Sequence, residues 1–284
     1  MNIKKILAGI DFEQDTERVL SYASFFAKQF DASLELLYVI DYLITPPSYV
    51  APYIEQEKNE ALQKFTGIGD RLAKEGVHAK TEVMVGRLQE SFDTASRKIQ
   101  ADLLVLGFVT HALRRSSAEK LIKGLQMPML VVRGRKADEA LTGSLKIKRI
   151  LCPFDFSEAS EKALGIAGEL QGLFSSELHV AHVIPDAISN KKIENSDSYK
   201  ATINALHQDN IANILKVISE KGIQGIPLVD KGIPANRIVA FSEERDIDLI
   251  VIGARGLGFI KGMLIGSVTD AVLKSSPCPV LVVH

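Results

Sequence analysis

The chain has 284 residues, of which 46% are hydrophobic and 24% are charged, and its formal net charge is −1. Such a chain is long enough for two ordinary globular domains, and its charge gives no general attraction to nucleic acid or to an anionic membrane. No apolar stretch approaches the ~18 residues of a membrane span, and the apolar run in residues 1–11 is too short for a signal peptide. We therefore expect a cytoplasmic protein whose two cysteines, Cys152 and Cys278, are buried free thiols.

An internal repeat organises the chain. Four segments of the first half recur in the second half in the same order: residues 4–12 and 148–156, 34–40 and 178–184, 102–107 and 248–253, and 128–132 and 279–283. Two copies of one fold explain this pattern. We expect one domain at residues 1–134 and another at residues 147–284, joined by a polar and flexible seam.

Each half is predicted to alternate strands with helices. In the first half the strands centre on residues 5–10, 34–40, 79–85, 102–107 and 129–133. Long helices are expected near residues 53–75, ending at Gly76, and near residues 197–221, ending at Gly222. Strands that alternate with helices form parallel sheets with right-handed crossovers. The predicted fold class is α/β, with two tandem Rossmann-like domains that each hold a five-stranded parallel sheet flanked by helices.

A glycine-rich loop follows the apolar run of residues 249–252. Its spacing is Gly253-x2-Gly256-x9-Gly266, and Ser267 then opens a segment with helical spacing. The first amide groups of a helix have no partner inside the helix, and the helix dipole favours anions there. Glycine lets backbone approach a ligand and tolerates positive φ, and Ser267 adds a hydroxyl donor. The order of strand, loop and helix N-terminus predicts a phosphate site.

An aspartate follows the first strand of each half, Asp11 in one and Asp155 in the other. A carboxylate at that place can accept hydrogen bonds from a ribose or an adenine. The spacings Asp11-x-x-Gln14 and Asp155-x-x-Glu158 also fit a helix-capping box with Asp as the cap. The sequence leaves both interpretations open, and the two roles can coexist.

The two halves differ at the phosphate loop, which is shorter in the first half. There Thr110 replaces Gly256, and Arg115 replaces Gly266. A side chain where backbone must approach phosphate would collide with it, so we expect one competent site, in the second half. Arg114 and Arg115 form a basic pair that is either solvated or a site for a different anion.

With this repeat and this glycine motif, the chain resembles a tandem universal stress protein over nearly all of both halves. The resemblance implies domains of the adenine-nucleotide α-hydrolase type that hold ATP, or AMP or ADP, with or without Mg²⁺. The residues that match those of the ATP-binding members are Pro153, Asp155, Val183, Gly253, Ala254, Arg255, Gly256, Gly266, Ser267 and Val268. It also implies that the last strands of the two halves pair as an intramolecular pseudo-dimer, which in turn could form a homodimer.

We expect a nucleotide-binding regulator of stress adaptation with slow hydrolysis or none, because no obvious base lies beside the loop and the histidines lack metal-ligand spacing. The sequence names no protein partner. One alternative is a scaffold that uses its surface for partners or for another small ligand. Another is an ATP-cleaving or adenylyl-transferring enzyme of the same broad fold.

Overall fold

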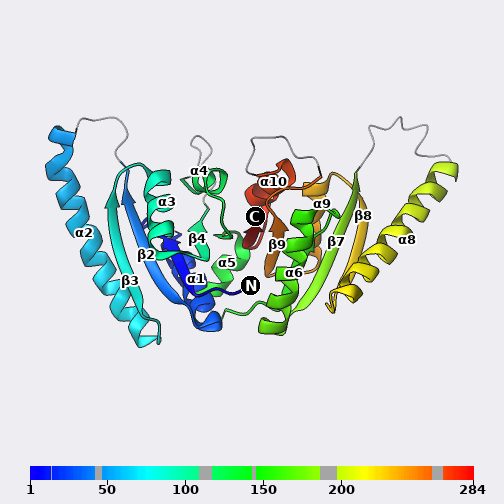
Figure 1. Ribbon diagram of the computed structural model, residues 1–284, viewed down its shortest axis with the longest axis horizontal. Helices are drawn as coiled ribbons and strands as arrows, with labels where there is room; N and C mark the ends of the chain where they lie inside the picture. Colours follow the sequence, from blue (N-terminus) through cyan, green and yellow to red (C-terminus); the bar gives the residue numbers. More distant parts are fainter. Residues whose placement is uncertain (14, 42–46, 109–116, 143–144, 186–196, 258–264) are drawn as a thin grey trace. The chain divides into compact units, whose positions relative to one another are not determined.

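The computed structural model describes residues 1–13, 15–41, 47–108, 117–142, 145–185, 197–257 and 265–284. The chain divides into two compact units, one formed by Asn2–Leu145 and the other by Lys146–His284 together with Met1. In each unit strands and helices alternate along the chain (Figure 1). The predicted α/β class and the tandem arrangement are confirmed. The pairing of the last strands across the two halves, and any dimer of the whole chain, stay predictions.

The first unit contains a parallel sheet with the strand order β3-β2-β1-β4-β5. Its strands are β1 (Lys5–Gly9), β2 (Ser33–Ile40), β3 (Ala79–Val85), β4 (Leu103–Gly107) and β5 (Met129–Val132). Its helices are α1 (Thr16–Phe30), α2 (Pro47–Lys74), α3 (Leu88–Ile99), α4 (Ser117–Gly124) and α5 (Arg135–Thr142). The chain reverses its direction of travel across the sheet between β1 and β4, so a ligand crevice is expected at the carboxyl ends of these two strands.

The second unit repeats this topology with the order β10-β9-β6-β7-β8. Its strands are β6 (Arg149–Pro153), β7 (Glu177–Pro185), β8 (Ile226–Gly232), β9 (Leu249–Gly253) and β10 (Val280–Val283). Its helices are α6 (Glu158–Phe174), α8 (Asp197–Glu220), α9 (Pro234–Glu244) and α10 (Ser267–Ser275). Here a crevice is expected between the carboxyl ends of β6 and β9.

The central strands form the core of the second unit. Every residue of β9 is buried, as the unbroken apolar run predicts for a parallel strand covered on both faces. In the neighbouring strand β6, Ile150, Leu151 and Cys152 are fully buried. Cys152 and Cys278 are both free and buried, which confirms that expectation. Burial raises the pKa of the Cys152 thiol far above its usual range, so this thiol is inert.

A carboxylate joins the two central strands of each sheet at their amino ends. Asp102 Oδ2 accepts hydrogen bonds from the backbone N–H groups of Lys4 and Lys5, at 2.8 and 3.0 Å. In the second unit, Asp248 Oδ2 accepts from Lys148 and Arg149 at the same distances. The repeated Asp before β4 and β9 therefore has a structural role, and it fixes the start of each central pair.

Two expectations were wrong, one about the seam between the halves and one about the start of α2. The seam between the halves was expected to be flexible, yet residues 135–142 form helix α5. Its Ala137 is fully buried, and its Asp138 is ion-paired with Arg18 of α1. The helix α2 begins at Pro47, earlier than predicted, because proline at the first helical position needs no amide partner.

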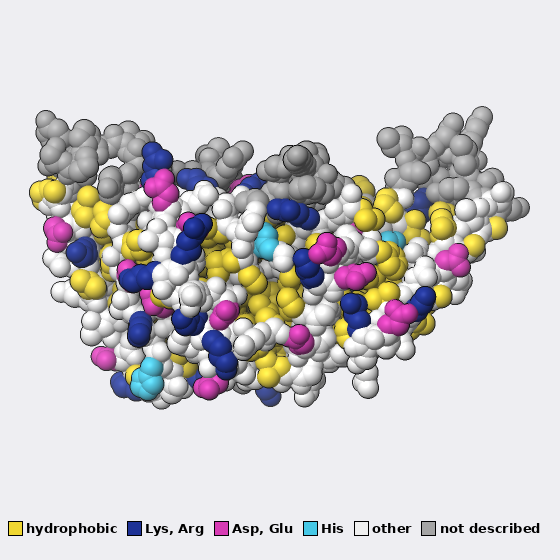
Figure 2. Space-filling model, in the orientation of Figure 1, with side chains coloured by type: hydrophobic (Ala, Val, Ile, Leu, Met, Phe, Trp, Pro, Cys, Tyr) yellow, Lys and Arg dark blue, Asp and Glu magenta, His cyan; other side chains and the backbone are white. Residues whose placement is uncertain are grey.

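The described surface carries charges of both signs. On the face shown in Figure 2, Lys and Arg side chains alternate with Asp and Glu side chains. Several ion pairs join residues one helical turn apart in the chain. Lys162 pairs with Glu158 at 2.9 Å, and Lys274 pairs with Asp270 at 2.7 Å. Among the helices that the structure describes, none is both long enough and apolar enough to cross a bilayer.

Two glycines of α6 provide a test of the packing. A Cβ added at Gly165 would meet nothing within 4 Å, whereas one at Gly168 would lie 2.8 Å from Ile223 Cδ1. We expect Gly165→Ala to raise the free energy of unfolding by about 0.5–1 kcal/mol, the usual helix-interior gain. Gly168→Ala should raise the free energy of unfolding by less, or should lower it, because the Ile223 side chain must move. Urea unfolding followed by circular dichroism measures both, and a greater gain for Gly168→Ala would contradict this packing.

Candidate functional site

The end of β9 lies directly against the start of α6. A Cβ on Gly253 would be 2.8 Å from both the carbonyl carbon and the oxygen of Ala159. On the other side, Thr269 Oγ1 of α10 donates a buried 2.8 Å hydrogen bond to the Gly253 carbonyl. Glycine is therefore required at position 253 by the close approach of a helix backbone. This contact brings β9, α6 and α10 together at the predicted crevice.

None of the three motif glycines has a positive φ. The tolerance of glycine for positive φ is therefore not used at these three positions. Gly253 and Gly256 are required by close contacts instead, since a Cβ on Gly256 would collide with Asp155 Oδ2. Within the described residues, the glycines at positions 253 and 256 therefore provide steric room.

Asp155 connects the end of β6 to the glycine loop. Its Oδ2 accepts a 3.0 Å hydrogen bond from the backbone N–H of Leu257. Its Oδ1 accepts from the Ser157 backbone N–H at 3.1 Å and from the Ser157 hydroxyl at 2.5 Å. Burial alone would raise the pKa of Asp155, but the hydrogen bonds from Ser157 and Leu257 outweigh it and hold the pKa below its usual value. Asp155 is therefore a carboxylate at neutral pH.

The capping-box interpretation of this aspartate is wrong. The cap of α6 is Ser157, whose side chain accepts from the Ser160 N–H at 3.2 Å. In the first unit, α1 begins after Asp15, and Asp11 Oδ1 instead accepts from the Glu13 N–H and the Thr16 hydroxyl. Each aspartate thus holds the turn that precedes its helix, which leaves the carboxylate beside the crevice.

Gly266 is the N-cap residue of α10, with φ −74° and ψ 157° and no side-chain cap. Its N–H donates to the Ala254 carbonyl at 2.8 Å. A Cβ here would lie 3.6 Å from Ala254 O and Arg255 Cα, which is ordinary contact. Ser267, the first residue of α10, is exposed. The start of α10 is therefore an open helix N-terminus that faces the loop, as predicted.

The remaining predicted residues lie at different depths. Pro153 ends β6, and Ala254 is buried beneath the loop, while Arg255 and Val268 are partly exposed. Val183 lies on β7, next to Asp230 of β8 in the sheet register, and is 8% exposed. The structure brings Asp155, Gly253, Gly256 and Gly266 together, whereas Val183 lies one strand beyond β6.

Sequence reasoning missed three residues of this site. Thr269 and Leu257 act through the hydrogen bonds to Gly253 and Asp155. Phe156 has a φ of 63°, which is rare for a bulky side chain, and its ring packs 5.1 Å from that of His182. Phe12 repeats this conformation in the first unit, with a φ of 57°. The repeated Asp-Phe dipeptide was the available signal for this turn.

The first unit differs from the second at the same place. A Cβ on Gly107 would lie 2.6 Å from the Cβ of Asp15, the residue that occupies the position of Ala159 in the repeat. Asp15 is 2% exposed, and burial raises its pKa although Arg18 donates to it at 2.7 Å. The predicted replacements Thr110, Arg114 and Arg115 lie outside the described residues, so the lost phosphate loop stays a prediction.

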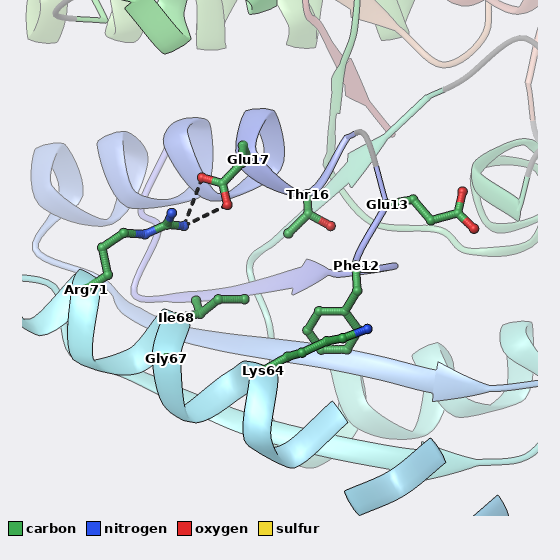
Figure 3. A pocket seen from close by; sticks show the side chains of 8 residues that line it. All are labelled: Phe12, Glu13, Thr16, Glu17, Lys64, Gly67, Ile68 and Arg71. Carbon is green, nitrogen blue, oxygen red and sulfur yellow. Dashed lines mark hydrogen bonds and ion pairs between the residues drawn. The ribbon is translucent and has the colours of Figure 1, made fainter. Parts of the chain in front are cut away.

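A cleft of about 340 Å³ in the first unit lies between the start of α1 and the middle of α2 (Figure 3). The Lys64 ammonium lies 5.0 Å from the centre of the Phe12 ring, and Arg71 is ion-paired with Glu17 at 2.9 Å. The cleft is lined by the turn after β1, at Phe12 and Glu13, and by the facing sides of α1 and α2. Within the described ranges, no group of three or more His, Cys, Asp or Glu could hold a metal ion.

Comparison with known proteins identifies the family of this chain. The model of the universal stress protein family matches residues 2–133 and 146–284. Universal stress protein MJ0577 of Methanocaldococcus jannaschii is 32% identical over 49% of this chain and 96% of its own length. A universal stress protein of Mycolicibacterium smegmatis is 26% identical over 98% of this chain and 96% of its own.

A solved structure shows the same fold over the whole chain. The crystal structure of a universal stress protein from Archaeoglobus fulgidus aligns with a TM-score of 0.74, at 21% identity, over 99% of this chain and 96% of that one. The family model matches far more than half of the sequence, and it matches each half separately. The chain therefore belongs to the universal stress protein family, with one family domain in each half.

Proposed function

We propose that this chain is a stress-response regulator that binds one adenine nucleotide, ATP, ADP or AMP, in its second domain. Family membership supports the general role in stress. The residues proposed to hold the nucleotide are Pro153, Asp155, Val183, Gly253, Ala254, Arg255, Gly256, Gly266, Ser267 and Val268. Mg²⁺ would accompany the phosphates of ATP rather than occupy a protein site of its own.

The observation that carries this proposal is the glycine at position 266. The backbone there suits any residue, and a Cβ would find ordinary contacts. Helix N-caps favour Ser, Thr, Asp, Asn and also Gly, but glycine has no side chain with which to satisfy the free amide groups. A glycine leaves those amides of α10 open, together with the exposed Ser267 hydroxyl. The fold does not require glycine here, so the residue is free to serve a ligand that uses the amides, and phosphate is the anion that suits them.

Asp155 supplies the complementary group for the sugar. It is charged at neutral pH. Its Oδ1 already accepts two hydrogen bonds from Ser157, whereas Oδ2 accepts one from Leu257 and can accept a further one. A ribose hydroxyl is a suitable donor. Since the pKa of Asp155 is lowered, this carboxylate is a weak base for activating water. The arrangement favours binding over hydrolysis.

The first prediction concerns stoichiometry. Purified protein should release close to one adenine nucleotide per chain when it is denatured, or bind one added ATP–Mg²⁺ by calorimetry. Chromatography and mass spectrometry identify the released species and its molar ratio. Two nucleotides per chain would show that the first domain also binds. No nucleotide under either condition would favour the scaffold alternative.

The second prediction separates binding from folding at Gly266. Asp is a good N-cap, so Gly266→Asp should keep or raise the free energy of unfolding, by roughly 0.3 kcal/mol. The same substitution should weaken ATP binding by roughly 100-fold or more, because a carboxylate against phosphate costs several kcal/mol. Calorimetric titration and urea unfolding measure the two effects.

Gly266→Ala is the matched neutral control for this substitution. It adds a side chain without charge, so it should weaken ATP binding less than Gly266→Asp does. Wild-type affinity in the Gly266→Asp variant would show that nucleotide does not bind at the start of α10.

A further inference from the structure

His284 follows β10 and lies beside the glycine loop. Val283 is in register with Gly253, and the Val283 carbonyl accepts a 2.6 Å hydrogen bond from the Ala254 N–H. The carbonyl of Ala254 in turn accepts from the Gly266 N–H at 2.8 Å. Residues 254 and 255 are therefore flanked by β10 on one side and by the start of α10 on the other. Figure 1 marks this end of the chain beside β9 and α10.

The His284 imidazole is arranged to remain neutral in the ligand-free chain. Its Nε2 is buried and has no hydrogen-bond partner among the described residues. Burial lowers the pKa of His284, and the nearby charge of Arg255 lowers it further. The neighbouring helix α10 carries one charged pair, Asp270 with Lys274 at 2.7 Å. A buried ring nitrogen without a partner is costly. An anion beside it would accept a hydrogen bond from the protonated ring and would offset the effects of burial and of Arg255 on the pKa.

The repeat places a basic residue at the same position in the first domain. There Arg133 follows β5, and its guanidinium lies 5.1 Å from the centre of the Phe108 ring. Phe108 corresponds to Ala254, and its N–H bonds to the Val132 carbonyl at 3.1 Å, as Ala254 does to Val283. A permanent cation at this position in one copy and a titratable one in the other is a chemical difference between the two domains.

We propose that His284 and Arg255 form the cationic wall of the phosphate site on its β10 side, and that His284 takes up a proton from solvent when a nucleoside di- or triphosphate binds. The inference rests on the proposed nucleotide site and adds its charge selectivity and its regulation by pH. In this arrangement the N-terminus of α10 binds the nearest phosphate of the nucleotide. The further phosphates of ADP or ATP bring negative charge toward residues 255 and 284. Binding of ATP is therefore stronger at acidic pH, and binding of AMP responds less.

The test is a calorimetric titration of the full chain with ATP–Mg²⁺ and with AMP at about pH 6 and about pH 8, which bracket the ordinary histidine pKa. His284→Gln keeps a polar side chain and cannot be protonated, and His284→Lys keeps a permanent charge. His78→Gln is the matched control, since His78 is exposed just before β3, at the opposite end of the strands and in the other domain.

The wild type and the His78→Gln variant should bind ATP up to roughly tenfold more tightly at the lower pH, as a rise of one unit in the pKa of His284 implies. In His284→Gln the additional pH dependence of ATP binding should be lost, and the affinity for ATP should fall. His284→Lys should bind ATP tightly at both pH values. The terminal phosphate of ATP also titrates, but it does so equally for all variants, so the difference between variants isolates His284.

NMR of the histidine rings in the wild type provides a measurement that does not depend on the Gln variant folding. The chain has six histidines, and the His284 signal is the one lost in His284→Lys. Its pKa should rise when ATP is added. An unchanged pKa, or an equal pH dependence of ATP affinity in wild type and His284→Gln, would overturn this inference alone. A wild type that binds no ATP at either pH would remove the proposed function as well.

Discussion

The close approach of β9 to the first turn of α6 is the constraint on which the candidate site depends. With no side chain at Gly253, the strand end lies against the Ala159 backbone, and Thr269 reaches the Gly253 carbonyl from α10. Because three elements meet at one residue, the loop that leaves β9 begins at a fixed point. Asp155 then fixes the next part of the loop through the Leu257 N–H. The open N-terminus of α10 is thus positioned by packing before any ligand arrives.

Most of the fold could be predicted from the sequence because strands buried on both faces are unbroken apolar runs that occur twice. The bounds of α2 and the helix α5 could not, since Pro47 can either end a loop or start a helix, and α5 packs through Ala137 and through the contact of Asp138 with the distant Arg18. Glycine spacing located the candidate site. The spacing could not reveal that a Cβ at Gly253 or Gly256 would be too close to neighbouring atoms. It also could not reveal that Ser157 caps α6 and that Asp155 does not. Those facts depend on residues distant in sequence or on competition between adjacent polar side chains.

The two domains show how one scaffold is altered by a few substitutions. Where the second domain places Ala159 beneath the strand end, the first places the buried carboxyl of Asp15, which is tied to Arg18. Arg18 also contacts Asp138 of α5, so the crevice of the first domain is linked to the segment that leads into the second. The difference between the domains therefore extends beyond the glycine motif.

The carboxylates of Asp102 and Asp248 also have a consequence for the order of folding. Each joins backbone amides about a hundred positions away in the chain, at the amino end of the central strand pair. Closing so long a loop costs entropy that only the completed intervening crossovers can offset. We therefore expect the central pair of each domain to form after its outer β-α-β units, so that assembly of the crevice between those two strands is a late step of folding. During synthesis, the first domain can complete this step before the second domain has left the ribosome.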